Sequence, residues 1–244
     1  MPKLLVAVVR YGILYYQTIS QEPDGKFYIS ILYEFEQDVA LVSLNESNII
    51  GLDYKSDGLY MDSNGNIGSN HKYYKESQNK LAKEQRKLSR MVGAKKGEIK
   101  SNNYKKQQLK VNKIHRKIAN QRKDNLHKLS TEIANRYDGV CVECLDMKAM
   151  SNKRFRNGKA TLDNGYGMFL TILKYKLEDR GKYYIEVDKW YPSSQVCSCC
   201  GMKHPEMKNL KMRTFNCSCG TSLNRDLNAA INIRNEGIRL LKEA

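Results

Sequence analysis

Four cysteines near the end of the chain have the spacing of a zinc site. They form two short turns separated by sixteen residues, Cys197-x-x-Cys200-Gly and Cys217-x-Cys219-Gly. A tetrahedral zinc ion requires four thiolates that converge from two such turns. The pattern therefore predicts a zinc ribbon with one structural ion, because a closed four-sulfur site leaves no coordination position open for chemistry.

Two further residues near these cysteines could also be zinc ligands. Cys199 is an additional thiol beside Cys200, and the second turn is tighter than the usual C-x-x-C, so Cys199 or His204 could replace one ligand. Five of the seven cysteines lie between Cys197 and Cys219. We expect neither a signal peptide nor a membrane span, so this clustering favours metal binding in a reducing, cytoplasmic compartment.

Three acidic residues could bind a second kind of metal ion. Asp53 and Glu143 each follow an apolar run typical of a buried strand, and Asp226 opens the last expected helix. A carboxylate in such a strand is unfavourable unless it is paired or binds a cation. Two Mg²⁺ ions held by carboxylates can activate water and stabilise the leaving oxygen in phosphodiester hydrolysis. We therefore expect Asp53, Glu143 and Asp226 to be catalytic ligands of two Mg²⁺ ions.

Each of these acids also has a plainer explanation. The helix dipole would favour Asp226 at a helix N-terminus, Asp53 could close a turn, and Glu143 could pair with a basic helix. The spacing of the three residues does not decide between these alternatives.

The positive charge of the chain is concentrated in one segment. The net charge is +16, and residues 71–130 contain 19 Lys and Arg against 4 Asp and Glu. Most charge runs are solvated helical faces, which is the alternative here. Because pairing within a helix cannot balance an excess of one sign this large, we expect the segment to contact nucleic acid. The candidate phosphate contacts are Lys83, Arg86, Lys87, Arg90, Lys105, Lys106, Arg116 and Arg122.

Alternating strands and helices must position these residues. Residues 1–47 are rich in β-formers, with a hairpin turn at Pro23-Asp24-Gly25. Helical spacing over about 72–137, broken at 93–97, predicts an antiparallel helical pair. Further on we expect strands at 139–147 and 182–190, a loop at 151–167, and helices at 169–180 and 225–242. The fold class is therefore α/β.

The motifs, in their order along the chain, resemble those of TnpB-type transposon proteins, the insertion-sequence OrfB family related to type V CRISPR effectors. The resemblance runs from about Lys26 to Gly237 and is carried by GLDY…LYMDSNG, LAKEQRKLSR, NQRKDNLHKLS, VECLDMKAM, DNGYGMF, LKYKLEDRGK, KWYPSSQVCSCCG and NRDLNAAINI.

This resemblance implies an RNase H-like (RuvC) nuclease with a zinc ribbon inserted before its last acidic motif. It also implies Mg²⁺-dependent cleavage of DNA directed by a guide RNA. By motif, Asp53, Glu143 and Asp226 correspond to the three catalytic acids, and Cys197, Cys200, Cys217 and Cys219 to the zinc ligands.

The chain also departs from the family pattern. Family members carry a longer N-terminal half, and residues 1–47 resemble only the last strands of its β-barrel. Cys144 stands where the family usually has Asp or Asn. The expected division is a barrel remnant at 1–47, a nuclease domain at 48–190 that includes the helical pair, a zinc ribbon at 191–223 and the last acidic motif at 224–244. The alternative function is a truncated nucleic-acid-binding relict or regulator without effective guided cleavage.

Overall fold

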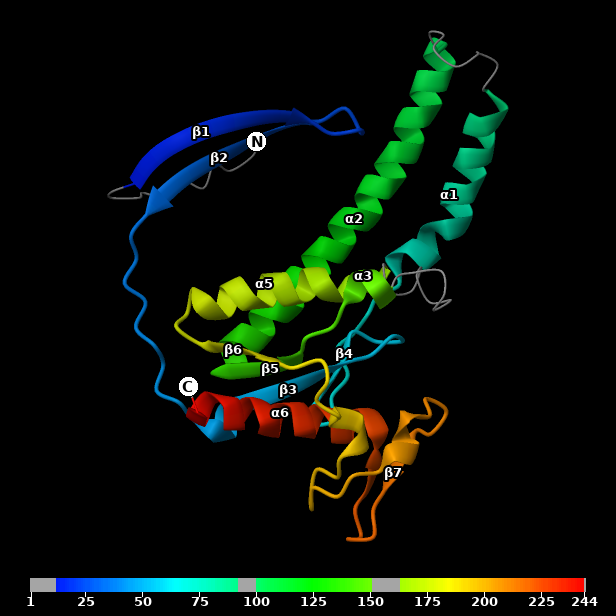
Figure 1. Cartoon of the computed structure of the whole chain (residues 1–244). Helices are drawn as coiled ribbons and strands as arrows, with labels where there is room; N and C mark the ends of the chain where they lie inside the picture. The colour runs from blue at the N-terminus through cyan, green and yellow to red at the C-terminus, as the bar shows by residue number, and fades with distance from the viewer. Residues whose placement is uncertain (1–11, 92–99, 151–162, 244) are drawn as a thin grey trace. The chain divides into compact units, whose positions relative to one another are not determined.

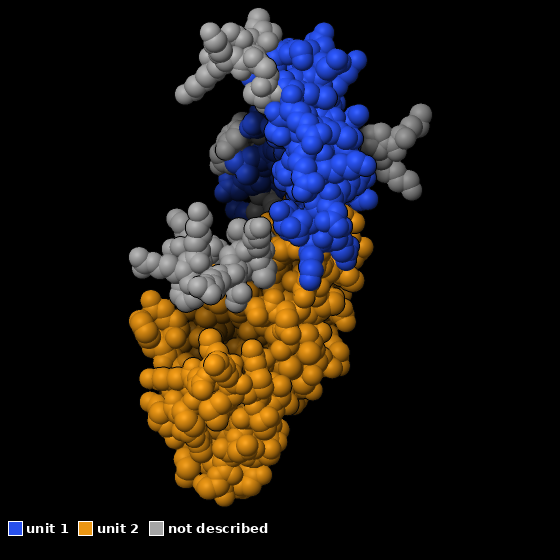
Figure 2. All heavy atoms as spheres, turned by 90° about the vertical axis from the view of Figure 1, so that its right-hand side faces the viewer, with its two compact units in different colours: residues 1–39, 74–120 blue, residues 40–73, 121–244 orange. Residues whose placement is uncertain are grey.

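The computed structural model describes residues 12–91, 100–150 and 163–243 of the chain. The chain divides into two compact units, which Figure 2 shows in different colours. The first unit comprises residues 1–39 and 74–120, and the second comprises residues 40–73 and 121–244. The expected boundaries at residues 47, 190 and 223 stay predictions.

The first unit contains a hairpin and most of a helical pair, whose second helix continues into the second unit from residue 121. Strands β1 (Gly12–Gln21) and β2 (Phe27–Phe35) are antiparallel, and Gly25 takes a φ of 86° in the turn between them, as the Pro-Asp-Gly signal predicts. Helix α1 spans Tyr73–Arg90, and α2 spans Asn102–Arg136. The predicted break at 93–97 lies outside the described residues.

A four-stranded sheet forms the centre of the second unit. Its strands β3 (Ile49–Tyr54), β4 (Tyr60–Asp62), β5 (Gly139–Glu143) and β6 (Tyr183–Val187) have the order β4-β3-β5-β6. Strand β4 is antiparallel to β3, whereas β5 is parallel to both of its neighbours, β3 and β6. Parallel strands need crossover connections, which α2 and helix α5 (Tyr166–Glu178) provide.

Helices cover both faces of this sheet, as Figure 1 shows. Helix α5 and the C-terminal part of α2 pack on one face, where Leu52, Val142 and Phe169 belong to the main apolar core. Helix α6 (Arg225–Glu243) packs on the other face, where a second core contains Cys141 and Ile233. Because strand side chains alternate between faces, every second residue of β3 and β5 faces α6.

Two glycines allow α6 to lie close to the sheet. A Cβ atom at Gly51 of β3 would overlap the carbonyl oxygen of Ala230, and one at Gly237 of α6 would overlap the Cys141 sulfur. The backbone of α6 can therefore approach β3 and β5 only because these positions lack side chains.

The remaining elements follow the sheet in sequence. Two short helices, η3 (Ser193–Gln195) and η4 (Pro205–Lys208), and the antiparallel strands β7 (Thr214–Asn216) and β8 (Ser222–Asn224) form the cysteine-containing segment. No helix in the described residues is both long and apolar enough to cross a bilayer.

Three predicted boundaries are wrong, and the first is that of the strand expected at 182–190, which ends at Val187. The strand expected at 139–147 ends at Glu143, and a short helix α3 (Met147–Met150) follows it. The loop expected to reach residue 167 ends earlier, because α5 already begins at Tyr166, after Gly165 in a left-handed conformation with φ 71°. The apolar run that continues to Leu145 is compatible with a longer strand, and the glycines Gly165 and Gly167 are typical of a loop.

Candidate active site and metal centre

Asp53 and Glu143 lie side by side on neighbouring parallel strands. The registered pairs of β3 and β5 end with Leu52 opposite Val142, so one residue further on Asp53 lies beside Glu143. Adjacent strands are about 4.8 Å apart. By the alternation of side chains, both carboxylates point to the face covered by α6, at the carboxyl ends of their strands.

Helix α6 brings the third carboxylate to this face. Asp226 is in the first turn of α6, and the side-chain oxygen of Asn224 accepts a hydrogen bond from its N–H at 2.9 Å. Lys55 extends from the end of β3, and its Nζ lies 2.9 Å from Oδ2 of Asp226. The helix N-terminus and Lys55 both stabilise the charge of Asp226.

The pKa of Asp53 reflects its burial and the charges of the other two carboxylates. Burial raises the pKa of Asp53 well above its ordinary value, and the negative charges of Glu143 and Asp226 raise it further, against smaller opposing effects of Arg225 and Lys55. Burial alone raises the pKa of Glu143 to about 7. Two buried carboxylates with a third nearby repel one another when charged, and a bound cation would offset this repulsion and the cost of burial.

The surroundings of the acids include unpaired polar atoms. Tyr166 is completely buried, and among the described residues its hydroxyl has no hydrogen-bond partner. The same holds for the hydroxyl of Tyr54 and for Oδ1 of Asn164. The charges of Asp53 and Glu143 both act on the Tyr166 hydroxyl. Buried polar groups are nearly always satisfied, so the Tyr166 hydroxyl, on which both acids act, could pair with a water molecule of a bound ion.

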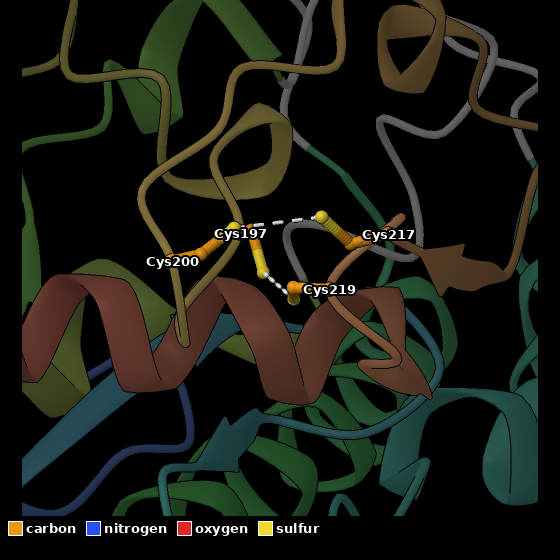
Figure 3. Close-up of side chains that lie close together, drawn as sticks. All are labelled: Cys197, Cys200, Cys217 and Cys219. Atoms are coloured by element: carbon orange, nitrogen blue, oxygen red, sulfur yellow. Dashed lines mark hydrogen bonds between the residues drawn. The ribbon is translucent and has the colours of Figure 1, made fainter.

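The four predicted zinc ligands meet at one point, as Figure 3 shows. The sulfurs of Cys197 and Cys219 are 3.7 Å apart, those of Cys200 and Cys217 are 3.5 Å apart, and all four lie within 4.8 Å of one another. Thiolates 2.3 Å from a shared zinc ion would lie roughly 3.8 Å apart. The cluster could therefore hold a metal ion.

The two alternative ligands lie outside this cluster. Cys199 is exposed and does not belong to the group of four. The Nδ1 atom of His204 lies 2.9 Å from Oε1 of Glu206, and its ring packs edge-on against Phe215 at 5.0 Å. The spacing alone could not distinguish these residues from the four ligands.

Most of the basic candidates are exposed, and three of them form ion pairs, including Lys87, whose Nζ lies 2.8 Å from Oε1 of Glu84. Arg116 lies 2.7 Å from Glu22 and 4.8 Å from the ring centroid of Tyr28, and Arg122 lies 2.8 Å from Asp163. Both arginines therefore also have structural roles. The exposed members of the set are Lys83, Arg86, Lys87, Arg90, Lys105 and Lys106.

Sequence reasoning missed three residues around the acids. Lys55 could have been found, because it follows Asp53 by two residues and so shares its face of β3. Asn164 and Tyr166 fell within a predicted loop. Asn164 is buried and donates hydrogen bonds to the carbonyl oxygens of Lys55 and Gly58, the former at 3.1 Å, so it fixes the turn after β3.

Comparison with protein families gives two adjoining matches. The OrfB_IS605 model, described as "Probable transposase", matches residues 30–154, which is half of the chain and includes Asp53 and Glu143. The chain belongs to the OrfB_IS605 family of TnpB-type proteins. A second model, described as "Cas12f1-like, TNB domain", matches residues 166–233, which include the cysteine cluster and Asp226.

Curated relatives are longer than this family member. A protein of Streptomyces pristinaespiralis named "Putative RNA-guided DNA endonuclease" is 32% identical over 91% of the chain and 52% of its own length. An Escherichia coli (strain K12) protein named "Putative RNA-guided DNA endonuclease InsQ" is 33% identical over 94% of the chain and 58% of its own length. The chain thus spans a little over half the length of these relatives.

Solved structures share the fold. A Cas12f1 chain from a complex with sgRNA and target DNA matches with a TM-score of 0.53 and 20% identity, over 92% of this chain and 66% of that chain. A Cas12f chain from a ternary complex matches with a TM-score of 0.50 and 21% identity, over 86% of this chain and 42% of that chain. This TnpB-type protein therefore has an α/β fold similar to that of Cas12f1.

Proposed function

We propose that this TnpB-type chain carries the Mg²⁺-dependent, RuvC-type active site of a DNA endonuclease that acts with a guide RNA. The observation that carries the proposal is the meeting of Asp53, Glu143 and Asp226 on one face of a mixed sheet. The names of the relatives support DNA as the substrate and RNA as the guide.

In this proposal the three carboxylates hold two Mg²⁺ ions. Bound Mg²⁺ would supply an activated water and stabilise the leaving oxygen. Asp53 and Glu143 provide neighbouring ligand atoms from rigid strands, and Asp226 closes the site from α6. The Tyr166 hydroxyl, buried and unpaired among the described residues, is available as a donor to a ligand oxygen or a water in the site.

The other predicted sites take supporting roles. The four-cysteine cluster would hold one structural zinc ion and so stiffen the segment that leads into α6. The exposed Lys and Arg side chains of α1 and α2 would contact nucleic-acid phosphates. The β1–β2 hairpin would be the remnant of an N-terminal β-barrel, and the domain division would follow the predicted boundaries.

Cleavage by the purified chain tests the proposal. Labelled single-stranded DNA is incubated with Mg²⁺ or EDTA and products are separated by denaturing electrophoresis. We expect Mg²⁺-dependent products that carry 5′-phosphates and disappear in Asp53→Asn, Glu143→Gln and Asp226→Asn. Glu186→Gln is the matched control, because this exposed carboxylate lies on the adjacent strand β6 in register with Val142.

Binding without cleavage would favour the alternative function. If the wild-type chain binds DNA or RNA with a steep salt dependence but yields no product with Mg²⁺, either alone or with RNA complementary to the DNA, it is a nucleic-acid-binding protein without this activity. Products that persist at full yield in all three variants would disprove the assignment of the acids.

A further inference from the structure

Lys55 places a positive charge inside the acidic site. Its Nζ lies 2.9 Å from Oδ2 of Asp226 and 3.4 Å from Oδ1 of Asp57. The side chains of Lys55 and Asp226 are each only 16% exposed, whereas that of Asp57 is 71% exposed. The pair with Asp226 is therefore the better shielded from water of the two.

The backbone of Lys55 is held on both sides. Its carbonyl oxygen accepts a hydrogen bond from the buried Asn164 side chain at 3.1 Å, and its N–H donates to the carbonyl oxygen of Leu59 at 3.3 Å. The same Asn164 amide also binds the Gly58 carbonyl oxygen. Lys55 thus leaves β3 from a fixed position, two residues after Asp53 and on the same face of the sheet.

A metal ion and this ammonium group would compete for one carboxylate. Mg²⁺ binds carboxylate oxygens at about 2.1 Å, so an ion on Asp226 would lie close to the Lys55 ammonium group on Oδ2, and the two cations would repel each other. Among the described residues neither Asp53 nor Glu143 forms an ion pair with Lys or Arg, although the charges of Arg225 and Lys55 act on Asp53 without direct contact. The two halves of the site therefore differ: Asp53 and Glu143 have no cation in contact, whereas Asp226 has one.

We propose that Lys55 is an internal counter-cation that makes metal binding sequential, with a first ion at Asp53 and Glu143 and a weaker second ion that must displace Lys55 from Asp226. This inference rests on the proposed function of the acids. The displaced ammonium group would then be free to bind another anion, and the phosphate backbone of a bound DNA strand is the anion that the proposed substrate offers. Metal at Asp226 and DNA phosphate would in this way favour each other's binding.

Metal titration tests the order of binding. Free Mn²⁺, counted by electron paramagnetic resonance, is measured without DNA in the wild type, Lys55→Met and Lys55→Arg. We expect one tight and one weak site in the wild type, a weak site about tenfold tighter in Lys55→Met, and no change in Lys55→Arg, which keeps the charge. Asp226→Asn should lose the weak site alone.

A second measurement uses only the wild-type chain. Acylation of lysines by acetic anhydride is followed by mass spectrometry in EDTA and in saturating Mg²⁺. The Lys55 amine should react several-fold faster with Mg²⁺, because it has left Asp226, while the exposed Lys128, which pairs with Asp124 at 2.6 Å, should not change.

The outcomes separate this inference from the proposed function. Two Mn²⁺ ions that bind with unchanged affinities in Lys55→Met, or an unchanged acylation rate of Lys55, would overturn the role of Lys55 and leave the metal site intact. A wild type and a Lys55→Met variant that both bind no metal would overturn the proposed function and this inference together.

Discussion

Replacement of Glu143 by Gln removes a carboxylate whose charged form is destabilised by burial. Burial raises its pKa from the ordinary 4.5 to about 7 in the folded chain. An acid with a raised pKa binds its proton more tightly in the folded state than in the unfolded state. The free energy of unfolding therefore falls as the pH rises from about 4.5 to about 7, and stays low above that range.

The size of this effect follows from the shift. A change of one pKa unit corresponds to about 1.4 kcal/mol, so the difference between 4.5 and about 7 gives roughly 3 kcal/mol. Glu143→Gln lacks this penalty, and it also removes a charge that raises the pKa of Asp53. In EDTA the variant should equal the wild type near pH 4 and exceed its free energy of unfolding by about 3 kcal/mol at pH 8.

Urea denaturation followed by circular dichroism, from pH 4 to pH 8 in EDTA, measures this difference. Glu186→Gln serves as the control, since its exposed carboxylate on β6 should leave the curve of the wild type unchanged. Adding Mg²⁺ at pH 8 should stabilise the wild type and not Glu143→Gln, because only the intact site binds the ion. Wild-type and Glu143→Gln stabilities that run parallel over the whole pH range would refute the reasoning.

Three further substitutions test the parts that surround the acids. Gly51→Ala should lower the free energy of unfolding by about 3 kcal/mol in urea denaturation, because its Cβ would overlap α6. The control Gly167→Ala, whose Cβ would make ordinary contacts with Met147, should change it little, and equal effects of the two would contradict the close packing of α6. Cys217→Ser should lose the zinc measured by plasma mass spectrometry and Cys199→Ser should keep one ion per chain; zinc retained by the former or lost by the latter would disprove the ligand set. Tyr166→Phe should raise the free energy of unfolding in EDTA by about 1 kcal/mol by removing a buried, unpaired hydroxyl, and a decrease would show that this hydroxyl is satisfied.

Local patterns were enough to predict most of the elements. The Pro-Asp-Gly turn, the apolar runs before Asp53 and Glu143, and the helical spacing of the basic segment all correspond to observed elements. These signals depend on neighbouring residues and on side-chain periodicity, both of which the sequence contains. The end of β5 was misjudged because the apolar run continues to Leu145, and the start of α5 was misjudged because Gly165 and Gly167 are typical of a loop.

The identity of the candidate site residues could also be predicted from sequence, but their surroundings could not. The spacing of the cysteines is typical of a metal site, and acidic residues within apolar strands are unusual, so both can be recognised in the sequence. Lys55 cannot be recognised in this way, because a lysine after a strand is usually solvated. Its meeting with Asp226 joins residues that are 171 positions apart.

The sequence by itself thus determined which residues could bind metal, because ligand type and spacing are local properties, and it determined the family through its motifs. Only the tertiary structure decided how those residues combine. The parallel register of β3 and β5 places Asp53 beside Glu143, and the absence of side chains at Gly51 and Gly237 lets α6 bring Asp226 to the same face. Register and close approach depend on contacts between distant segments, which no local pattern encodes.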